Sequence, residues 1–332
     1  MAHYLVTGGC GFIGSHLADL LLAGGHTVRV LDDLSTGKRE NLSPQAELVI
    51  GDVADPEKVA QAMAGVDGCF HLAAVASVDR CNRDWLGTHR TNLTGTITIF
   101  DCARATAARP AIPVVYASSA AIYGDQPQVP QDERMGPQPL SSYGADKLGC
   151  ELHARVATHL HGVPAVGMRF FNVYGKRQDP KSPYSGVISI FCDRLRQDLP
   201  ITVFGDGQQV RDFVYVGDVV RALELAMAAH AKLPAGSVFN VCTGRSTSIL
   251  LLADTIATLW GRKPSIVQAP PRAGDIRVSI GSPERAAAAL GFQASTTLPV
   301  GLGRMLLGDL PERPPLAEPA PAATHAAPAA AT

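Results

Sequence analysis

A tyrosine and a lysine four residues apart are the side chains of this sequence best suited to moving a proton. Tyr143 and Lys147 lie in the stretch SSYGADK, and on a helix they would share one face. A free tyrosine titrates near pH 10, which makes it a poor base at neutral pH (pKa about 10). An ammonium group one helical turn away favours the phenolate. Because ordinary surface pairs share this spacing, the assignment depends on whether the chain also supplies a cofactor and a substrate site.

The composition of the chain is typical of a globular protein. The chain has 332 residues, 46% of them hydrophobic and 18% charged, as expected for one large or two fused globular domains. A net charge of -1 argues against nucleic acid or an anionic membrane as partner. The seven cysteines form no CxxC pair and suggest a reducing compartment. With no signal-like N-terminus and no apolar run long enough for a membrane helix, we expect a cytoplasmic protein.

The first 32 residues predict a dinucleotide site. An apolar strand at residues 4–7 runs into Gly8, Gly11 and Gly14, a helix follows, and a second strand at 27–31 leads to Asp32. In such a βαβ unit the glycines permit a tight turn, close approach to a pyrophosphate, and packing of helix on strand. Amides at the helix start can bind the phosphates. An aspartate at the second strand's end accepts hydrogen bonds from a ribose diol, which favours NAD over NADP.

The rest of the chain continues the alternation of strand and helix. Apolar strands are expected at 48–53, 69–74, 114–118 and 165–171, with helices near 56–64, 87–108 and 143–161. This pattern predicts an α/β fold with a doubly wound parallel Rossmann sheet. Beyond residue 172 longer Pro- and Gly-rich loops indicate a smaller mixed α/β lobe. We therefore expect an NAD-binding domain at 1–172, to which residues 238–242 return, a mainly substrate-binding lobe at 173–310, and a disordered Pro/Ala-rich tail at 313–332.

A series of short motifs resembles the extended short-chain dehydrogenase/reductase family, and within it the UDP-hexose 4-epimerases. The resemblance covers residues 4–292. It rests on the ordered motifs TGGCGFIG (7–14), LDDLSTGKRENL (31–42), GDV (51–53), HLAA (71–74), TNLTGT (91–96), SSAAIYGD (118–125), YGADK (143–147), RFFNVYG (169–175), VRDFVYVGDVV (210–220) and RAGD (272–275).

This resemblance implies a set of cofactor contacts. The NAD site would be lined by Gly8, Gly11, Phe12, Ile13, Asp32, Asp52, Val53, Leu72, Ala73, Ala74, Asn92 and Phe170, together with Tyr143 and Lys147, and Ser35, Thr36 and Gly37 would lie near the ADP moiety. Asp52 would accept from the adenine amino group. From its sequence position alone it is equally a helix N-cap ahead of Pro56.

The resemblance also implies the chemistry. Tyr143 would be the general base, Lys147 its modulator and a ribose ligand, and Ser119 the proton relay at the sugar's 4-hydroxyl. No metal is required. The UDP-sugar would be held by Ser119, Tyr143, Asn172, Phe204, Arg211, Arg272, Asp275 and Ser279. Related dehydratases and decarboxylases carry carboxylates just after the relay serine, where this chain has Ala120 and Ala121, which favours simple epimerisation.

For the sugar, Ser279 occupies a position where a tyrosine crowds the C2 substituent in relatives restricted to glucose and galactose. The smaller serine favours UDP-N-acetylglucosamine/UDP-N-acetylgalactosamine as the preferred pair, with UDP-glucose/UDP-galactose as a second activity. The alternatives are a UDP-glucuronate 4-epimerase, with Arg177 or Arg194 meeting the carboxylate, and a non-catalytic NAD-binding sensor or scaffold. The resemblance further implies a homodimer formed through the helices near 87–108 and 143–161.

Overall fold

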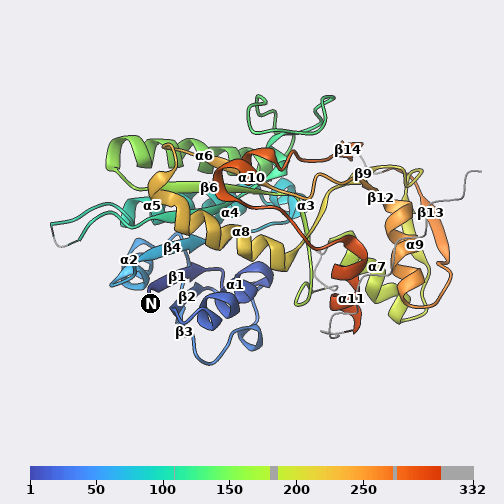
Figure 1. Cartoon of the computed structure of the whole chain (residues 1–332), viewed down its shortest axis with the longest axis horizontal. Coiled ribbons are helices and arrows are strands. Elements are labelled where there is room, and N and C mark those ends of the chain that lie inside the picture. The colour runs from blue at the N-terminus through green and yellow to red at the C-terminus, as the bar shows by residue number, and fades with distance from the viewer. Residues whose placement is uncertain (108, 180–185, 272–274, 308–332) are drawn as a thin grey trace, which may run out of the picture.

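A seven-stranded parallel sheet forms the larger part of the molecule (Figure 1). The computed structural model describes residues 1–107, 109–179, 186–271 and 275–307. The sheet has the order β11-β6-β5-β4-β1-β2-β3. Its strands are β1 (His3–Thr7), β2 (Thr27–Asp32), β3 (Glu47–Ile50), β4 (Gly68–His71), β5 (Val114–Ser119), β6 (Ala165–Phe170) and β11 (Val238–Val241). The chain starts in the middle of the sheet, builds outward to β3, and then crosses to the other side, which is the doubly wound arrangement.

Helices cover both faces because successive strand residues point to opposite sides. Val6 and Phe70 belong to one apolar cluster, whereas their neighbours Leu5 and Cys69 belong to another. The first cluster packs under α1 (Phe12–Ala23) and α8 (Val216–Ala229), and the second under α2 (Pro56–Met63), α5 (Gly95–Cys102) and α6 (Ser142–His161). The predicted fold class is thereby confirmed.

A smaller lobe lies beside the carboxyl ends of the strands, at the right of Figure 1. It contains three small sheets, β10-β7, β12-β9-β14 and β13-β8. Their strands are β7 (Asn172–Tyr174), β8 (Ile201–Phe204), β9 (Val210–Arg211), β10 (Phe213–Tyr215), β12 (Thr247–Ser248), β13 (Ile266–Ala269) and β14 (Val278–Ser279). The remaining helices after residue 172 are α7 (Val187–Arg196), α9 (Ile249–Leu259), α10 (Glu284–Leu290) and α11 (Leu298–Leu307).

The expected helix at 87–108 is wrong in its extent. The structure begins α4 (Trp85–His89) after the N-cap Asp84, continues through a π-helical turn (Arg90–Thr94), and ends α5 at Cys102. A separate short helix, α3 (Val78–Arg83), precedes α4. The π-turn forms where the buried Asn92 turns its amide group to the backbone of Val75, a long-range contact that local sequence does not encode. Ala108 lies outside the described residues, as does the segment predicted to be the tail.

Two strand ends also differ from expectation. β3 stops at Ile50, so Asp52 follows the strand instead of ending it. Asp52 is not the N-cap of α2 either, because Asp55 accepts the amides of Glu57 and Lys58. β4 stops at His71, which leaves Leu72, Ala73 and Ala74 in the connection after the strand. The division into domains at residue 172 stays a prediction.

Candidate active site

The glycine turn has the geometry of a phosphate cradle. Gly8 has a φ of +68°, and a Cβ added there would lie 2.8 Å from the Cα of Ala73. A Cβ on Gly14 would lie 2.2 Å from the carbonyl oxygen of Gly8. Gly11 is the N-cap of α1 and has no side chain to cover the amides of Phe12 and Ile13. The turn therefore leaves a helix start open to an anion, as a dinucleotide pyrophosphate requires.

Asp32 closes one side of this cradle. Its carboxylate accepts from the amides of Cys10 at 2.9 Å and Leu34 at 2.8 Å. Burial raises the pKa of Asp32, and the two backbone hydrogen bonds oppose that shift. A Cβ on Gly37 would lie 2.9 Å from an Asp32 oxygen, so only glycine leaves the carboxylate accessible from this loop. Ser35 and Thr36, which are predicted to lie near the ADP moiety, are exposed in the loop after β2.

Asp52 and Asn92 are linked to the π-turn. Asp52 accepts from the amide of Ala54 at 2.8 Å and pairs with Arg90 at 3.2 Å. Val53 is buried and packs on Gly95, where a Cβ would come within 2.7 Å of it. Asn92 is fully buried and holds the amide and carbonyl of Val75. The π-turn thus connects Asp52 and Asn92, two of the predicted NAD contacts.

The backbone of Leu72 and Ala73, which follows β4, is held in place by a side chain of the neighbouring strand β1. The hydroxyl of Thr7 accepts from the amides of Leu72 and Ala73, both at 3.2 Å, and lies 2.8 Å from Nδ1 of His71. Burial, assisted by the charge of Lys147, lowers the pKa of His71 to about 3. His71 is therefore neutral at working pH, and its role is to form hydrogen bonds within the core.

The structure brings the three predicted catalytic residues to one region. Ser141 caps α6 by accepting the amide of Gly144 at 3.1 Å, which starts the helix just before Tyr143. The Lys147 Nζ lies 5.8 Å from the centroid of the Tyr143 ring and donates to the carbonyl of Ala117 at 2.9 Å. Lys147 is 2% exposed, so its ammonium is held in a largely water-free position.

Ser119 is the last residue of β5 and lies next to α6. Its hydroxyl accepts from the amide of Ala121 at 3.1 Å, at the start of the 3₁₀ turn Ala120–Ile122. A Cβ on Gly144 would lie 2.7 Å from the Ala121 carbonyl, which shows how closely this turn packs against the first turn of α6. Ser119 also pairs in register with Phe170 on β6. These contacts place the serine and the tyrosine on adjoining elements.

A buried network that sequence reasoning missed holds these elements together. Glu151, one turn beyond Lys147, forms an ion pair with Arg169 at 2.7 Å, and Ser118 donates to the same carboxylate at 2.5 Å. Arg169 also donates to the hydroxyl of Tyr123 at 2.8 Å, and that hydroxyl donates to Asn240 at 2.7 Å. The network joins α6 to β5, β6 and β11 directly behind the catalytic residues.

The predicted substrate residues form a second group in the smaller lobe. Arg211 and Ser279 are register partners on β9 and β14, and Arg211 pairs with Asp275 at 2.5 Å. Burial lowers the pKa of Arg211, and Asp275 opposes that shift. Asn172 is exposed on β7, where its backbone N–H donates to the carbonyl of Asp212 at 2.9 Å. Arg272 lies outside the described residues.

Gln209 is a further residue that the sequence did not single out. Its amide donates to the carbonyl of Phe204 at 3.0 Å and to Asp275 at 3.4 Å, which connects two predicted nucleotide contacts. By contrast, the arginines considered for a uronate carboxylate have other partners. Arg177 pairs with Asp19 at 2.7 Å, and Arg194 donates to the carbonyl of Pro200 at 2.5 Å.

Within the described residues, no three or more His, Cys, Asp and Glu side chains gather in a way that could hold a metal ion. No helix in that part of the chain is long and apolar enough to span a membrane.

The glycine cradle, the buried Asp32 and the Tyr143–Lys147 pair together define a dinucleotide-dependent α/β enzyme.

Comparison with known proteins identifies the family. The model of the NAD dependent epimerase/dehydratase family matches residues 4–242. A UDP-glucose 4-epimerase of Mycolicibacterium smegmatis is 38% identical over 307 residues, which cover 90% of this chain and 96% of the relative. The chain belongs to the NAD dependent epimerase/dehydratase family, and the predicted family and NAD as cofactor are confirmed.

Solved structures agree with this assignment. The UDP-glucose 4-epimerase of Thermotoga maritima with UDP-glucose has a TM-score of 0.87 and 36% identity, covering 92% of this chain and 98% of that one. The UDP-N-acetylglucosamine 4-epimerase of Methanobrevibacter ruminantium in complex with UDP-N-acetylmuramic acid has a TM-score of 0.86 and 30% identity, covering 92% and 97%. The roles of individual site residues stay predictions.

Proposed function

We propose that this protein interconverts the C4 epimers of a UDP-hexose, with UDP-N-acetylglucosamine and UDP-N-acetylgalactosamine as the preferred pair and UDP-glucose and UDP-galactose as a second activity. The observation that carries the proposal is the Tyr143–Lys147 pair on α6, packed against the turn that follows Ser119. UDP-sugar 4-epimerases among the relatives and solved structures support the reaction class.

In the proposed mechanism the residues of the chain transfer one proton from the sugar and back to it. Ser119 orients the sugar's 4-hydroxyl, and Tyr143 removes its proton as the sugar is oxidised to a 4-keto form. Lys147, anchored by the Ala117 carbonyl, keeps a positive charge near the phenolate. NAD, when bound, supplies the reversible hydride chemistry. After the 4-keto sugar has turned about its diphosphate, Tyr143 returns the proton to the same oxygen, and C4 then has the opposite configuration.

The diphosphate has to stay fixed while the sugar turns. Arg211 suits this task because its guanidinium is already oriented, by Asp275 and by the carbonyls of Val210 and Ile276 at 2.9 and 2.7 Å. A planar, pre-oriented guanidinium binds phosphate with little further loss of side-chain freedom. The turn after Ser119 carries Ala120 and Ala121 and no carboxylate, which supports a reaction confined to C4.

The sugar preference rests on Ser279. As the register partner of Arg211, it lies next to the proposed diphosphate contact, where a small side chain leaves room for an acetamido group. Ser279→Tyr is expected to lower kcat/KM for UDP-N-acetylglucosamine about 10- to 200-fold and to leave UDP-glucose turnover within about threefold. Parallel rate measurements on both substrates check this expectation. An equal loss on both sugars would show that Ser279 does not select between them.

The decisive assay incubates the purified protein separately with UDP-N-acetylglucosamine, UDP-glucose and UDP-glucuronate, without added NAD, and resolves the products. We expect the C4 epimer of the first, a slower reaction of the second, and none of the third. The absence of a C4 epimer from all three would overturn the epimerase proposal. Reaction of UDP-glucose alone would overturn only the sugar preference.

The competing functions are less well supported. A uronate epimerase needs a cation for the sugar carboxylate, whereas Arg177 reaches Asp19 on α1 and Arg194 reaches the Pro200 carbonyl, and neither partner is a predicted sugar contact. A non-catalytic NAD-binding sensor would have no use for the buried Lys147 beside Tyr143 and the adjoining Ser119. Dehydration or decarboxylation would need a carboxylate where Ala120 and Ala121 stand.

We further propose a homodimer formed through α6 and the neighbouring α4 and α5. Leu152, Val156 and Leu160 lie four residues apart on α6 and are 52%, 46% and 67% exposed, an apolar stripe that faces solvent in the single chain. On α4, Trp85 and Leu86 are also exposed. A stripe of this kind on two antiparallel helix pairs is suited to a four-helix interface.

Val156→Glu is expected to convert the dimer into a monomer, because it places a charge at the centre of this stripe. Light scattering coupled to gel filtration measures the mass directly. Leu251→Glu is the control, since Leu251 is comparably exposed on α9 in the other lobe. A monomeric parent protein, or a Val156→Glu variant that stays dimeric, would contradict the proposed interface.

A further inference from the structure

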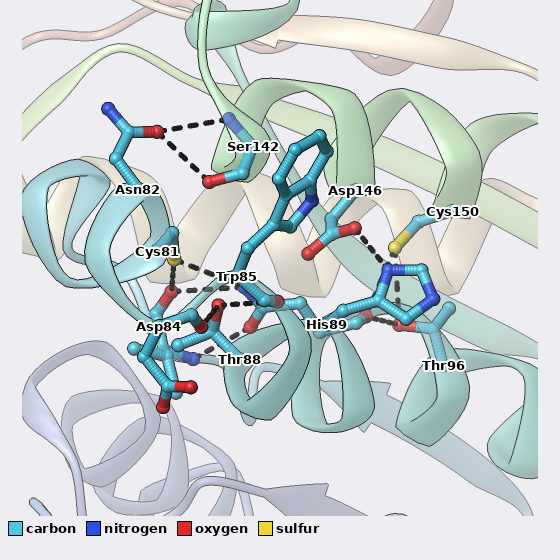
Figure 2. Close-up of polar contacts among 12 residues, drawn as sticks. Cys81, Asn82, Asp84, Trp85, Thr88, His89, Thr96, Ser142, Asp146 and Cys150 are labelled. Atoms are coloured by element: carbon cyan, nitrogen blue, oxygen red, sulfur yellow. Dashed lines mark hydrogen bonds and ion pairs between the residues drawn. The ribbon is translucent and has the colours of Figure 1, made fainter.

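The catalytic helix α6 carries two parallel rows of polar residues, each with a spacing of four. The first row consists of Tyr143, Lys147 and Glu151 and belongs to the site described above, where Lys147 and Glu151 bond to Ala117 and Ser118 of β5. The second row consists of Ser142, Asp146 and Cys150 and is directed toward α3, α4 and the π-turn (Figure 2). The proposed reaction makes no direct use of this second row.

Each member of the second row is hydrogen-bonded to the elements that cover it. Ser142 donates to Asn82 Oδ1 through its amide at 3.2 Å and its hydroxyl at 3.0 Å. Asp146 Oδ1 lies 2.7 Å from His89 Nδ1. Cys150 Sγ lies 3.3 Å from both the Asn92 carbonyl and the Thr96 hydroxyl, so its one S–H can donate to either of them. Figure 2 shows Asn82 of α3 and His89 of α4 reaching toward Ser142 and Asp146 of α6.

Asp146 is the member of this row whose burial is least favourable for the stability of the fold. It is 4% exposed, and its second oxygen, Oδ2, is buried without a hydrogen-bond partner among the described residues. A buried carboxylate destabilises a fold unless its contacts repay the loss of hydration, and alanine would serve helix formation better. The contact that Asp146 gains is the one with His89, at the residue immediately before Lys147.

His89, the other partner of this contact, lies at the end of α4. It is the last residue of α4 and directly precedes the π-turn that contains Asn92. The next residue, Arg90, pairs with Asp52 on the cofactor side. A bond from His89 to Asp146 therefore fixes the second turn of α6 relative to the π-turn, which carries the predicted NAD contact Asn92 and, through Arg90, pairs with a second one, Asp52.

We propose that the His89–Asp146 hydrogen bond positions Tyr143 and Lys147 against the cofactor and the sugar. His89 and Asp146 are positioning residues, because the lysine and the tyrosine do the chemistry and the pair sets the rotation of the helix that bears them. A displacement of about 1 Å at reacting groups can cost on the order of 100-fold in rate. The inference rests on the proposed function in so far as turnover is its readout.

The test uses a matched pair of substitutions at His89. Asparagine keeps an N–H donor near the position of Nδ1, whereas leucine has a similar shape and no donor. We expect His89→Leu to lower kcat about 10- to 100-fold with KM and bound NAD unchanged, and His89→Asn to recover most of that loss. The control is Asp79→Asn on α3, which removes an exposed ion pair with Arg83 and is expected to leave kcat unchanged.

Amide hydrogen exchange over residues 142–150 provides a readout that needs no activity. Faster exchange is expected in His89→Leu and parent-like exchange in His89→Asn. Unchanged exchange and kcat in His89→Leu would overturn the inference. So would an asparagine variant as slow as the leucine one, or a loss explained entirely by lower NAD content. If the parent protein epimerises no UDP-sugar, the proposed function fails, and the exchange data alone decide the positioning role.

Discussion

Tyr143→Phe is expected to lower epimerase turnover about 10²- to 10⁴-fold while the protein still carries NAD. The substitution removes one oxygen and keeps the ring whose centroid lies 5.8 Å from the Lys147 ammonium. The packing of α6 and the anchoring of Lys147 on the Ala117 carbonyl should therefore persist. Turnover is measured with the better of the UDP-sugars, and bound NAD is quantified after acid release from the same preparation.

Tyr4→Phe is the appropriate control. Tyr4 lies on β1, where its ring packs edge-on against Phe70 and His26, and it has no proposed role in the reaction. Its variant should retain parent turnover. Near-normal activity of Tyr143→Phe would remove Tyr143 as the base, and loss of NAD together with activity would indicate a binding defect in place of a chemical one.

Arg169→Met is expected to produce the largest loss of stability, about 3–5 kcal/mol in the free energy of unfolding. Arg169 and Glu151 are 5% and 7% exposed, and the guanidinium also serves the Tyr123 hydroxyl. Removing it leaves a buried carboxylate without its cation. Urea denaturation followed by circular dichroism measures the change.

Two companion variants test the reason for that loss. The double variant Arg169→Met with Glu151→Met should regain much of the stability, because apolar side chains replace both charges. Arg104→Met removes a solvent-exposed partner of Asp101 and should change stability by less than about 1 kcal/mol. A single Arg169→Met variant as stable as the parent would mean that the buried network contributes little.

The spacing of apolar residues, together with the residues at the strand ends, made most of the fold predictable. Alternation of apolar strands and amphipathic helices is a local property, and the structure shows a doubly wound sheet with Asp32 and Ser119 as the last residues of β2 and β5. Reactive side chains gather there because the carboxyl ends of parallel strands share one edge. The type and order of most elements up to residue 172 could thus be obtained without coordinates, whereas most of the rest of the chain was predicted only as a mixed α/β lobe.

The parts that escaped prediction depend on contacts between distant residues. The helix expected at 87–108 is interrupted because Asn92 bonds to Val75 and its carbonyl accepts from Cys150. Glu151 and Arg169 each resemble an ordinary surface charge in the sequence, and only their meeting behind Ser118 makes them a buried pair. Gln209 escaped notice for the same reason, since an isolated glutamine carries no sign of what it bridges.

The edge strand β11 has a consequence for how the chain matures during synthesis. β6 ends at Phe170, but its outer neighbour β11 begins only at Val238, after β7–β10, α7 and α8 have been made. Until then the growing polypeptide presents the free edge of β6, and Tyr123 lacks its partner Asn240. Open strand edges pair readily with other chains. The seven-stranded sheet is therefore complete only after residue 241 has been made, and a fragment ending near residue 172 would be prone to aggregate.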